Sequence, residues 1–476
     1  MSEPSAKVSI EERLRLSEVD RTFKWPALIF VFSAMFWLLL GTTFAIISSF
    51  KLHSPDFLGG VEWLTFGRVR SAHLNAVGIG WSSTMAFAAS LWLMGRLCQT
   101  PLRNAWLVMM AAVVWNLGLI YGIFGILSGR MTSVEWLEMP KEIAPVLALA
   151  YVLIGLWTIL TFKYRKTGHV YVSQWYILAA AFWFPWIYSI AELLILWIPA
   201  RGVVQPLTNW WFGHNYLGLW ITPIGVATAY YLIPKVLGKP IHSYYLSLIG
   251  FWSLALFYNW AGVHHLVGGP LPAWVISSGI VASVMMLVPV IVTGINHHMT
   301  VVGSFKKVWQ SPTLRFVVFG AINYSLSSIF GTIMAVRSVS VTTHFTNFVV
   351  GHAHHGLYAF FTMIMFGLIY FMLPRVLNKE WPSALLIKIH WWCAAIGITL
   401  MVTALQVGGW FQGTLMNNPA IPFLDVVRSQ IGYFHARSLS GIILTVAHVV
   451  FFAHILWMVS YKPKEKRETP TLLADA

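Results

Sequence analysis

The sequence predicts an all-α membrane protein whose chain crosses the bilayer twelve times. Of its 476 residues, 58% are hydrophobic and only 10% are charged, whereas a soluble domain carries about 25% charged residues. Apolar runs long enough for a bilayer-spanning helix, which needs about 20 residues, follow one another along the chain. This composition excludes an ordinary soluble protein.

The apolar runs give the expected spans in chain order, with short connections and no second domain. Residues 1–23 are charged, lack the pattern of a cleavable signal peptide and should form a short N-terminal segment. Twelve helices should fill 24–461, and 462–476 should form a basic tail. The runs lie at 25–48, 72–97, 104–127, 143–163, 170–199, 208–233, 244–267, 272–296, 314–336, 346–373, 384–409 and 433–460.

Lysine and arginine concentrate in every second loop, and the intervening loops have fewer cations. Because cytoplasmic loops carry an excess of these residues, we expect the even-numbered loops and both termini to face the cytoplasm. The net charge of +15 then follows from topology and indicates no nucleic-acid partner. The loop cations are Arg96, Arg103, Lys163, Arg165, Lys166, Lys235, Lys239, Lys306, Lys307, Arg375 and Lys379.

Seventeen histidines are many for a membrane chain, because an unpaired polar group in hydrocarbon is costly. Six of them fall at one depth in the outer part of the bilayer. Since neutral imidazole is the commonest metal ligand in proteins, this layer predicts metal centres. The six are His73, His214, His264, His265, His352 and His354. Histidines expected at span ends, where they can meet water, are His169, His242, His297, His298 and His344.

Helical residues two apart point about 200° apart. His352 and His354 should therefore face opposite sides of one helix and serve two different centres. His73 is left to pair with one of them across a haem, and the other would bind a second haem alone. His355 follows this pair directly and is the histidine least expected to be a ligand.

The adjacent residues His264 and His265 stand at a predicted helix end before two glycines. Both can turn toward one metal at such an end, with His214 as the third ligand. The layer thus predicts one haem with two histidines, one haem with a single histidine and one metal with three.

At this point the chain resembles the catalytic subunit of the cbb3-type cytochrome c oxidases, the C-family of haem–copper oxidases. The motifs FGRVRSAH, NWWFGHN, YNWAGVHH and GHAHHG occur at compatible spacing, and the resemblance covers nearly the whole chain. It implies the twelve-helix bundle of a haem–copper oxidase subunit I in the bacterial cytoplasmic membrane. It also implies reduction of O2 to water, with proton uptake from the cytoplasm and pumping.

The resemblance assigns the ligands. His73 and His354 resemble the axial ligands of low-spin haem b, and His352 resembles the single ligand of high-spin haem b3. The three remaining histidines, His214, His264 and His265, resemble the copper ligands. The chain has two cysteines and no CxxCH motif, so a partner subunit carrying haem c is implied.

Tyr258 resembles the active-site tyrosine of this family, which is cross-linked to the copper histidine that corresponds to His214. Splitting O2 without releasing peroxide takes four electrons at once. The metals supply three, and a tyrosine can supply the fourth together with a proton. Other oxidase families place this tyrosine four residues after the copper histidine, where this chain has Gly218.

Further residues follow from the same resemblance. Candidates to hold the haem propionates on the outer side are Arg68, Arg70, His344 and Arg437. Hydroxyl groups that line a route for protons from the cytoplasm to the active site are Thr222, Tyr230, Tyr231, Ser247 and Ser253.

The chain departs from the family at two places. Phe330 occupies the position of a glutamate that lies twenty-two residues before the haem b3 ligand. The acidic pair of a family calcium site is not evident, although Glu135 and Glu138 stand nearby, so a calcium site stays open. Glu192 is an intramembrane carboxylate that either substitutes for a missing group or sits near the outer surface.

Two alternatives remain. A nitric oxide reductase of the same superfamily would hold non-haem iron, which favours a carboxylate ligand. HNYLG offers no carboxylate near His214, and Tyr258 is present, so copper and O2 are favoured. A secondary transporter can also have twelve spans, but it predicts broken helices at the midplane and internal symmetry, and it gives no reason for six histidines at one depth.

Overall fold

The computed structural model describes residues 10–461, and the structural statements below concern that part of the chain. The described residues are helical with no strand, which confirms the all-α class. Twelve helices among them are long and apolar enough to cross a membrane, as the sequence predicts. The expected basic tail at 462–476 lies outside the described residues.

The spans follow the predicted order. The first six are Ile10–His53, Phe66–Cys98, Ala105–Leu127, Lys141–Lys163, Val172–Trp197 and Val204–Leu237. The second six are Tyr244–Leu266, Ala273–Val301, Pro312–Ala335, Asn347–Leu377, Ala384–Met416 and Phe423–Ser460.

Several spans consist of two or three helical segments. The long uninterrupted helices are α1 (Ile10–His53), α4 (Ala105–Leu127), α13 (Pro312–Ala335) and α17 (Ala384–Met416). The other segments within spans are α2 (Phe66–Asn75), η2 (Ala76–Ser83), α3 (Thr84–Cys98), η3 (Lys141–Ile143), α5 (Ala144–Lys163), α6 (Val172–Glu192), η4 (Leu193–Trp197), α7 (Val204–Asn215), η5 (Tyr216–Ile221), α8 (Thr222–Leu237), α9 (Tyr244–Ala261), η6 (Gly262–Leu266), α10 (Ala273–Met285), α11 (Leu287–Val301), α15 (Asn347–His354), η7 (His355–Thr362), α16 (Met363–Leu377), α18 (Phe423–Ser429) and α19 (Ile431–Ser460). Short helices in the loops are η1 (Glu62–Leu64), α12 (Phe305–Gln310) and α14 (Arg337–Thr343).

The first helix begins earlier than the sequence predicts. A separate segment was expected up to residue 23, but α1 is continuous from Ile10. The reason is tertiary: Asp20 is buried and accepts hydrogen bonds from Trp92 and Arg96 on α3. This ion pair holds the charged first turns against the bundle, so the helix extends through them.

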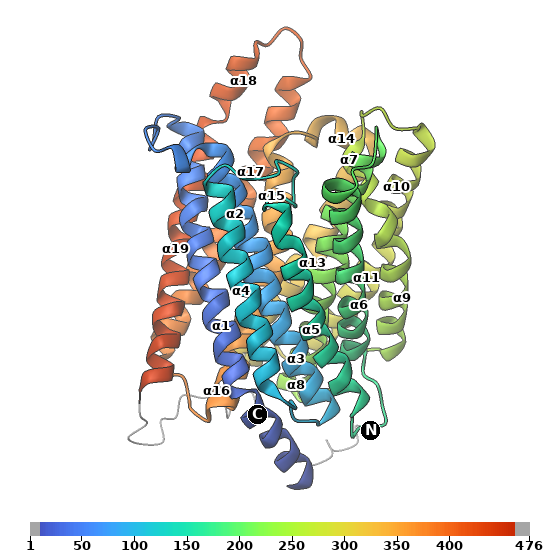
Figure 1. Cartoon of the computed structure of the whole chain (residues 1–476), viewed down its shortest axis with the longest axis vertical. Coiled ribbons are helices and arrows are strands. Elements are labelled where there is room, and N and C mark those ends of the chain that lie inside the picture. Colours follow the sequence, from blue (N-terminus) through green and yellow to red (C-terminus); the bar gives the residue numbers. More distant parts are fainter. Residues whose placement is uncertain (1–9, 462–476) are drawn as a thin grey trace.

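The bundle has a distinct centre. The second, sixth and tenth spans have 94%, 89% and 83% of their most apolar stretch buried, whereas no other span exceeds 50%. In Figure 1, α1 and α19 lie at one side of the bundle and α9 and α10 at the opposite side. The three central spans therefore supply the core, and the others cover it or face lipid.

Each central span also changes its winding from α to π. Their π-helical segments are η2, η5 and η7, which begin within three residues after His73, His214 and His354; the described residues have a fourth π-helical segment, η4, at the end of the fifth span. Segments of π-helix inside α-helices occur frequently at functional sites, because the wider turn re-aims side chains. This local geometry marks the same three helices that carry histidines of the predicted layer.

Candidate functional site

The structure brings three of the six histidines together. The ligand atoms of His214, His264 and His265 all lie within 4.8 Å of one another. His214 comes from α7, and the other two come from η6, a single tight turn that ends the seventh span. This turn is the helix end that the sequence predicts, and it lets adjacent residues face one point.

Neighbouring groups orient these rings. His264 Nδ1 lies 2.7 Å from Ser283 Oγ, and that hydroxyl donates to the carbonyl of Gly279 at 2.8 Å. Ser283 therefore accepts from Nδ1–H, which leaves His264 Nε2 as the ligand atom. His265 stacks on Trp210 with ring centroids 4.1 Å apart. His214 Nδ1 is buried with no partner among the described residues.

Tyr258 on α9 lies against this cluster. Its ring centroid is 4.5 Å from that of His214. Gly218 makes room for it, because a Cβ at that position would lie 1.6 Å from Tyr258 Cε1. The tyrosine thus occupies the place that a side chain at position 218 would fill.

His73 and His354 face each other across a gap. Their rings are nearly parallel, at 15°, with centroids 6.3 Å apart. His73 Nδ1 donates to the carbonyl of Gly41 and His354 Nδ1 donates to that of Val350. Both Nε2 atoms are therefore unprotonated and available as ligands. Two metal–imidazole bonds of about 2.0 Å, plus about 1.1 Å from nitrogen to centroid on each side, separate such rings by about 6 Å. The pair therefore fits one six-coordinate iron.

His352 lies on the other side of α15, as its spacing from His354 predicts. It is close enough to His214 and His264 to interact with them electrostatically. Gly331 on α13 leaves space for its ring, since a Cβ there would lie 2.9 Å from His352 Cε1. His352 Nδ1 is buried without a partner among the described residues. Phe330 replaces the expected glutamate, so no carboxylate at that position holds this nitrogen.

The residues present fit two haems and one metal. The paired rings suit a bis-histidine iron, and the orphan nitrogens of His214 and His352 suit further metal ligands. A set of three histidines without a carboxylate suits copper or zinc better than non-haem iron.

The four candidate propionate residues lie in different surroundings. Arg68 already donates to Glu62 and to the carbonyl of Leu127. Arg70 pairs with Glu135 at 2.7 Å. Arg437 lies within electrostatic range of His73 and His354, and no described carboxylate pairs with it.

His344 is the fourth candidate and stacks on Phe345, with ring centroids 4.0 Å apart. Partial burial lowers its pKa, so the ring is neutral at pH 7 and can donate one hydrogen bond. Of the four, Arg437 and His344 are the two that lie near the histidine clusters and have no acidic partner among the described residues.

The expected proton-route residues do not form one continuous chain. Ser247 and Ser253 donate back to their own helix, at Tyr244 O and Ile249 O. The Tyr231 hydroxyl accepts from Arg96. Tyr230 is buried, and its hydroxyl accepts from Asn296 at 3.3 Å. Thr222 begins α8.

One histidine expected to meet water does not. His297 is 3% exposed, and neither ring nitrogen has a partner among the described residues. Its ring packs against Tyr230 with centroids 4.4 Å apart. The eighth span extends five residues past the expected end at 296, to Val301, which buries this position.

Glu135 and Glu138 have different environments. Glu135 is half-buried and pairs with Arg70, whereas Glu138 is 2% exposed and its Oε2 accepts from Asn75 at 2.9 Å. Burial raises the pKa of Glu138 to about 7. Its Oε1 has no partner among the described residues. Glu138 is thus the only one of the two that points inward, and the described residues group no three acidic ligands here.

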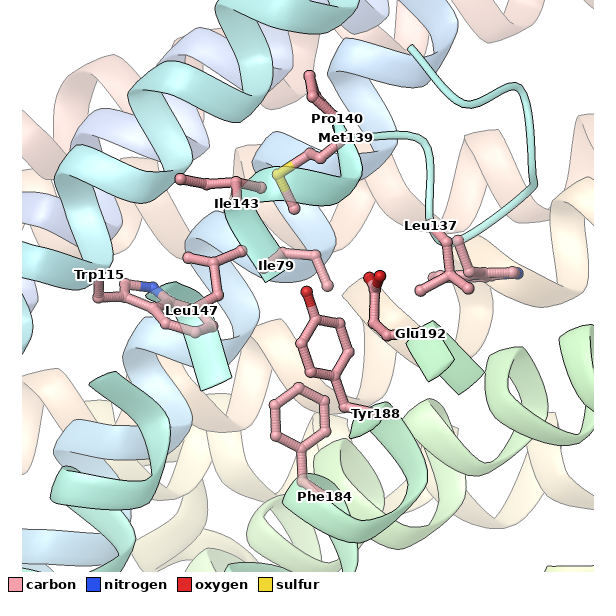
Figure 2. A pocket seen from close by; sticks show the side chains of 11 residues that line it. Ile79, Trp115, Leu137, Met139, Pro140, Ile143, Leu147, Phe184, Tyr188 and Glu192 are labelled. Carbon is pink, nitrogen blue, oxygen red and sulfur yellow. The ribbon is translucent and has the colours of Figure 1, made fainter. Parts of the chain in front are cut away.

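Glu192 lies inside the protein rather than at its surface. It is 8% exposed and lines a small cavity together with Tyr188, whose hydroxyl points toward its carboxyl group (Figure 2). Trp136 closes the cavity and also packs against Gly213, next to His214. Trp136 thus contacts both the cavity of Glu192 and the helix that carries His214.

Three further histidines are buried in the structure. His390 and His454 are 0% exposed and His448 is 2% exposed. His390 lies on α17, and His448 and His454 lie on α19. Their residue type was visible in the sequence, but no motif or spacing connects them.

Comparisons with known proteins show the family of this chain. The family model described as "Cytochrome C and Quinol oxidase polypeptide I" matches residues 26–443. The chain is 29% identical over 445 residues to the "Cbb3-type cytochrome c oxidase subunit CcoN1" of Stutzerimonas stutzeri, covering 90% of this chain and 92% of that protein. It is 30% identical over 467 residues to cytochrome c oxidase subunit 1 of Rhodobacter capsulatus, covering 91% and 85%.

A cryo-EM structure of a haem–copper terminal oxidase dimer has the same fold. It aligns with a TM-score of 0.70 at 16% identity and covers 97% of this chain and 86% of that chain. The family match spans most of the sequence, and the predicted resemblance is confirmed. The chain therefore belongs to the cytochrome c and quinol oxidase polypeptide I family, as an oxidoreductase subunit of the cbb3 type.

Proposed function

We propose that this subunit reduces O2 to water at a centre formed by His352, which holds haem b3, and by the three histidines His214, His264 and His265, which hold copper. One observation carries the proposal: Tyr258 lies against His214, and the metal-binding cluster contains no carboxylate. Haem and copper, when bound, would supply electrons to O2.

The chain's own residues do the rest. Ser283 fixes the tautomer of His264, and Tyr258 can give an electron and a proton from its hydroxyl. The cluster includes no Asp or Glu side chain among the described residues, so Tyr258 would give the proton at this site, and further protons would arrive along the sixth and seventh spans. Tyr230 on this route is hydrogen-bonded to Asn296 on the eighth span.

His73 and His354 would hold haem b, through which electrons arrive from a partner subunit that carries haem c. Arg437 would compensate the propionate charges, and His344 would donate a hydrogen bond to a propionate. The cation-rich loops support a bacterial cytoplasmic membrane with both termini on the cytoplasmic side, and proton pumping is part of the proposal. Glu138 is the residue on which a calcium site would depend.

The test uses the purified complex. We expect a dithionite-reduced spectrum with low-spin and high-spin b-type haem, one copper per chain and O2 consumption with a reduced c-type cytochrome. Tyr258→Phe should keep both haem signals and lose O2 reduction. A complex with an additional iron, no copper and nitric oxide reduction would contradict the proposal and favour the reductase alternative. A colourless complex would contradict both.

A further inference from the structure

Aromatic and basic side chains gather at the end of the bundle where α13 and α17 begin. The short helix α12 lies in the loop before α13, and its Trp309 packs against Trp391 and Trp392 on α17, with ring centroids 5.6 and 6.1 Å apart. The guanidinium of Arg315 on α13 lies 5.9 Å from the ring centroid of Trp391. Three helices thus bring three indoles and one arginine together, and none of these side chains has a role in the proposed chemistry.

Two buried donors of this group have no hydrogen-bond partner among the described residues. They are Nε of Arg315 and Nε1 of Trp391, a residue that is only 9% exposed. No ion pair between described residues involves Arg315. Burying a donor without an acceptor is costly, above all when the donor is charged. These two N–H groups therefore need an acceptor that the described part of the chain does not supply.

Other arginines at the same end of the bundle differ from Arg315. Arg96 is also buried, but it pairs with Asp20 at 2.8 Å. Arg103 lies over the ring of Tyr164, yet it is exposed and can reach water. An arginine that only marks the membrane boundary extends its charged head into water. The buried and unpartnered Nε of Arg315 indicates instead that this guanidinium binds a ligand.

Further cations flank the three indoles. Lys306 on α12 precedes Trp309 by three residues, and Lys388 on α17 precedes Trp391 by three residues. Residues three apart are neighbours on the surface of a helix. Both lysines are exposed, and no ion pair between described residues involves either of them. Together with Arg315, they give the aromatic surface a positive charge that no described carboxylate balances.

The depth of this group matches the boundary between lipid headgroups and hydrocarbon. Arg315 and Trp391 lie about 5 and about 10 Å along the axis from the first residues of α13 and α17. Tryptophan is enriched at this boundary. Phe305 and Trp309, one turn apart on α12, are 67% and 57% exposed, so this helix presents apolar side chains to the bilayer. The acceptor that reaches Arg315 at this depth therefore belongs to a lipid headgroup.

We propose that this surface binds an anionic phospholipid, whose phosphate accepts hydrogen bonds from Nε of Arg315 and Nε1 of Trp391. A guanidinium suits this task, because its planar N–H groups match the oxygens of a phosphate. Lys306 and Lys388 attract the negative lipid and repel the cationic group of a zwitterionic one. Basic pockets between transmembrane helices are typical sites for the headgroup of cardiolipin, and its two phosphates suit the several cations here.

The bound lipid would join α12, α13 and α17, which surround it. This inference does not rest on the proposed function, because the site contains no haem or copper ligand. It also does not depend on which side of the membrane this end of the bundle faces. Lipid binding can therefore be measured independently of O2 reduction.

The experiment titrates the purified complex, stripped of lipid by detergent, with tetraoleoyl cardiolipin and measures bound lipid by native mass spectrometry. Arg315→Gln keeps a polar side chain but removes the charge. It should raise the dissociation constant of the tightest-bound cardiolipin about tenfold, as expected for a lost hydrogen bond to a charged group. Arg103→Gln is the matched control, because it removes an arginine from another aromatic ring and should leave the constant unchanged. An unchanged constant in Arg315→Gln would overturn the inference.

Two competitors identify the source of the phosphate. Dioleoyl phosphatidylcholine should bind more weakly than cardiolipin, and equal binding of the two lipids would overturn the preference for a negative headgroup. Excess inorganic phosphate should not displace cardiolipin from the wild-type complex. Displacement would show a site for a soluble anion and would refute the lipid assignment.

A second variant keeps the inference testable if Arg315→Gln does not assemble. Trp391→Phe retains an aromatic ring and loses the N–H group. It should weaken cardiolipin binding about threefold, as expected for one lost hydrogen bond. The optical spectrum of the variant should equal that of the wild-type complex, which shows that the fold is intact. Cardiolipin binding at wild-type affinity in Trp391→Phe would refute the role of this donor and with it the proposed headgroup site.

Discussion

The ring of Tyr258 fills the volume that a side chain at Gly218 would need. A Cβ on residue 218 would lie 1.6 Å from Cε1 and 1.9 Å from Cζ of the tyrosine ring, which comes from another span. The Tyr258 ring can therefore occupy this place only because residue 218, four residues after His214, is a glycine. The two positions are alternatives, and this chain combines the glycine with the tyrosine on α9.

Gly218→Ala should consequently displace the Tyr258 ring without touching a haem ligand. Misplacing a reacting group by about 1 Å can cost about 100-fold in rate. We expect O2 consumption to fall by about this factor while both haem signals persist in the reduced spectrum. Gly432→Ala is the matched control, because nothing lies within 4 Å of a Cβ there. Wild-type turnover in Gly218→Ala would contradict the packing.

Ser283→Ala should weaken copper binding. The hydroxyl accepts from His264 Nδ1–H and so fixes which nitrogen faces the cluster. Loss of such an orienting partner costs about 10–100-fold in metal affinity. The copper content retained after dialysis against graded chelator measures this. Ser278→Ala serves as the comparison, since its hydroxyl is exposed and bonds only the carbonyl of Val275. Equal retention in both variants would show that the hydroxyl does not orient the ligand.

Glu138 should make stability depend on pH. Burial raises its pKa from 4.5 to about 7, so the folded state binds this proton more tightly than the unfolded state. The resulting stability is fully present below pH 4.5 and is lost as pH rises through about 7, by at most about 3 kcal/mol. Glu138→Gln should flatten this part of the profile in thermal unfolding of the complex.

The same variant separates two roles of Glu138. If the carboxylate binds calcium, added calcium should raise the unfolding temperature of the wild-type complex above pH 7 and should not raise that of Glu138→Gln. Equal responses of the two proteins would remove Glu138 from any calcium site.

The ion pair between Asp20 and Arg96 should be the costliest one to break. Both side chains are about nine-tenths buried, and Asp20 also accepts from Trp92. Removing one member of a buried pair leaves an unpaired charge, which costs about 3–5 kcal/mol. Asp20→Asn should lower the free energy of unfolding by an amount of this order. Asp425→Asn breaks an exposed pair with Arg428 and should change it little. Equal effects of Asp20→Asn and Asp425→Asn on the free energy of unfolding would mean that the Asp20–Arg96 pair is exposed to water.

The sequence by itself determined the number of spans, their order and the layer of six histidines. These are local properties: an apolar run of sufficient length must span, and a histidine inside it needs a partner. The opposite faces of His352 and His354 follow from helix geometry alone. The role of Tyr258 could be predicted only from the family resemblance, because a single tyrosine in an apolar helix forms no recognisable pattern.

Only the tertiary structure decided which groups meet across spans. It extended α1 through Asp20, because the partner Arg96 lies on α3, and it buried His297 by lengthening α11. It fixed the tautomers of His73 and His354 through carbonyls of Gly41 and Val350. It also buried His390 on α17 and both His448 and His454 on α19. Such contacts depend on packing between segments far apart in the chain, which neither periodicity nor spacing encodes.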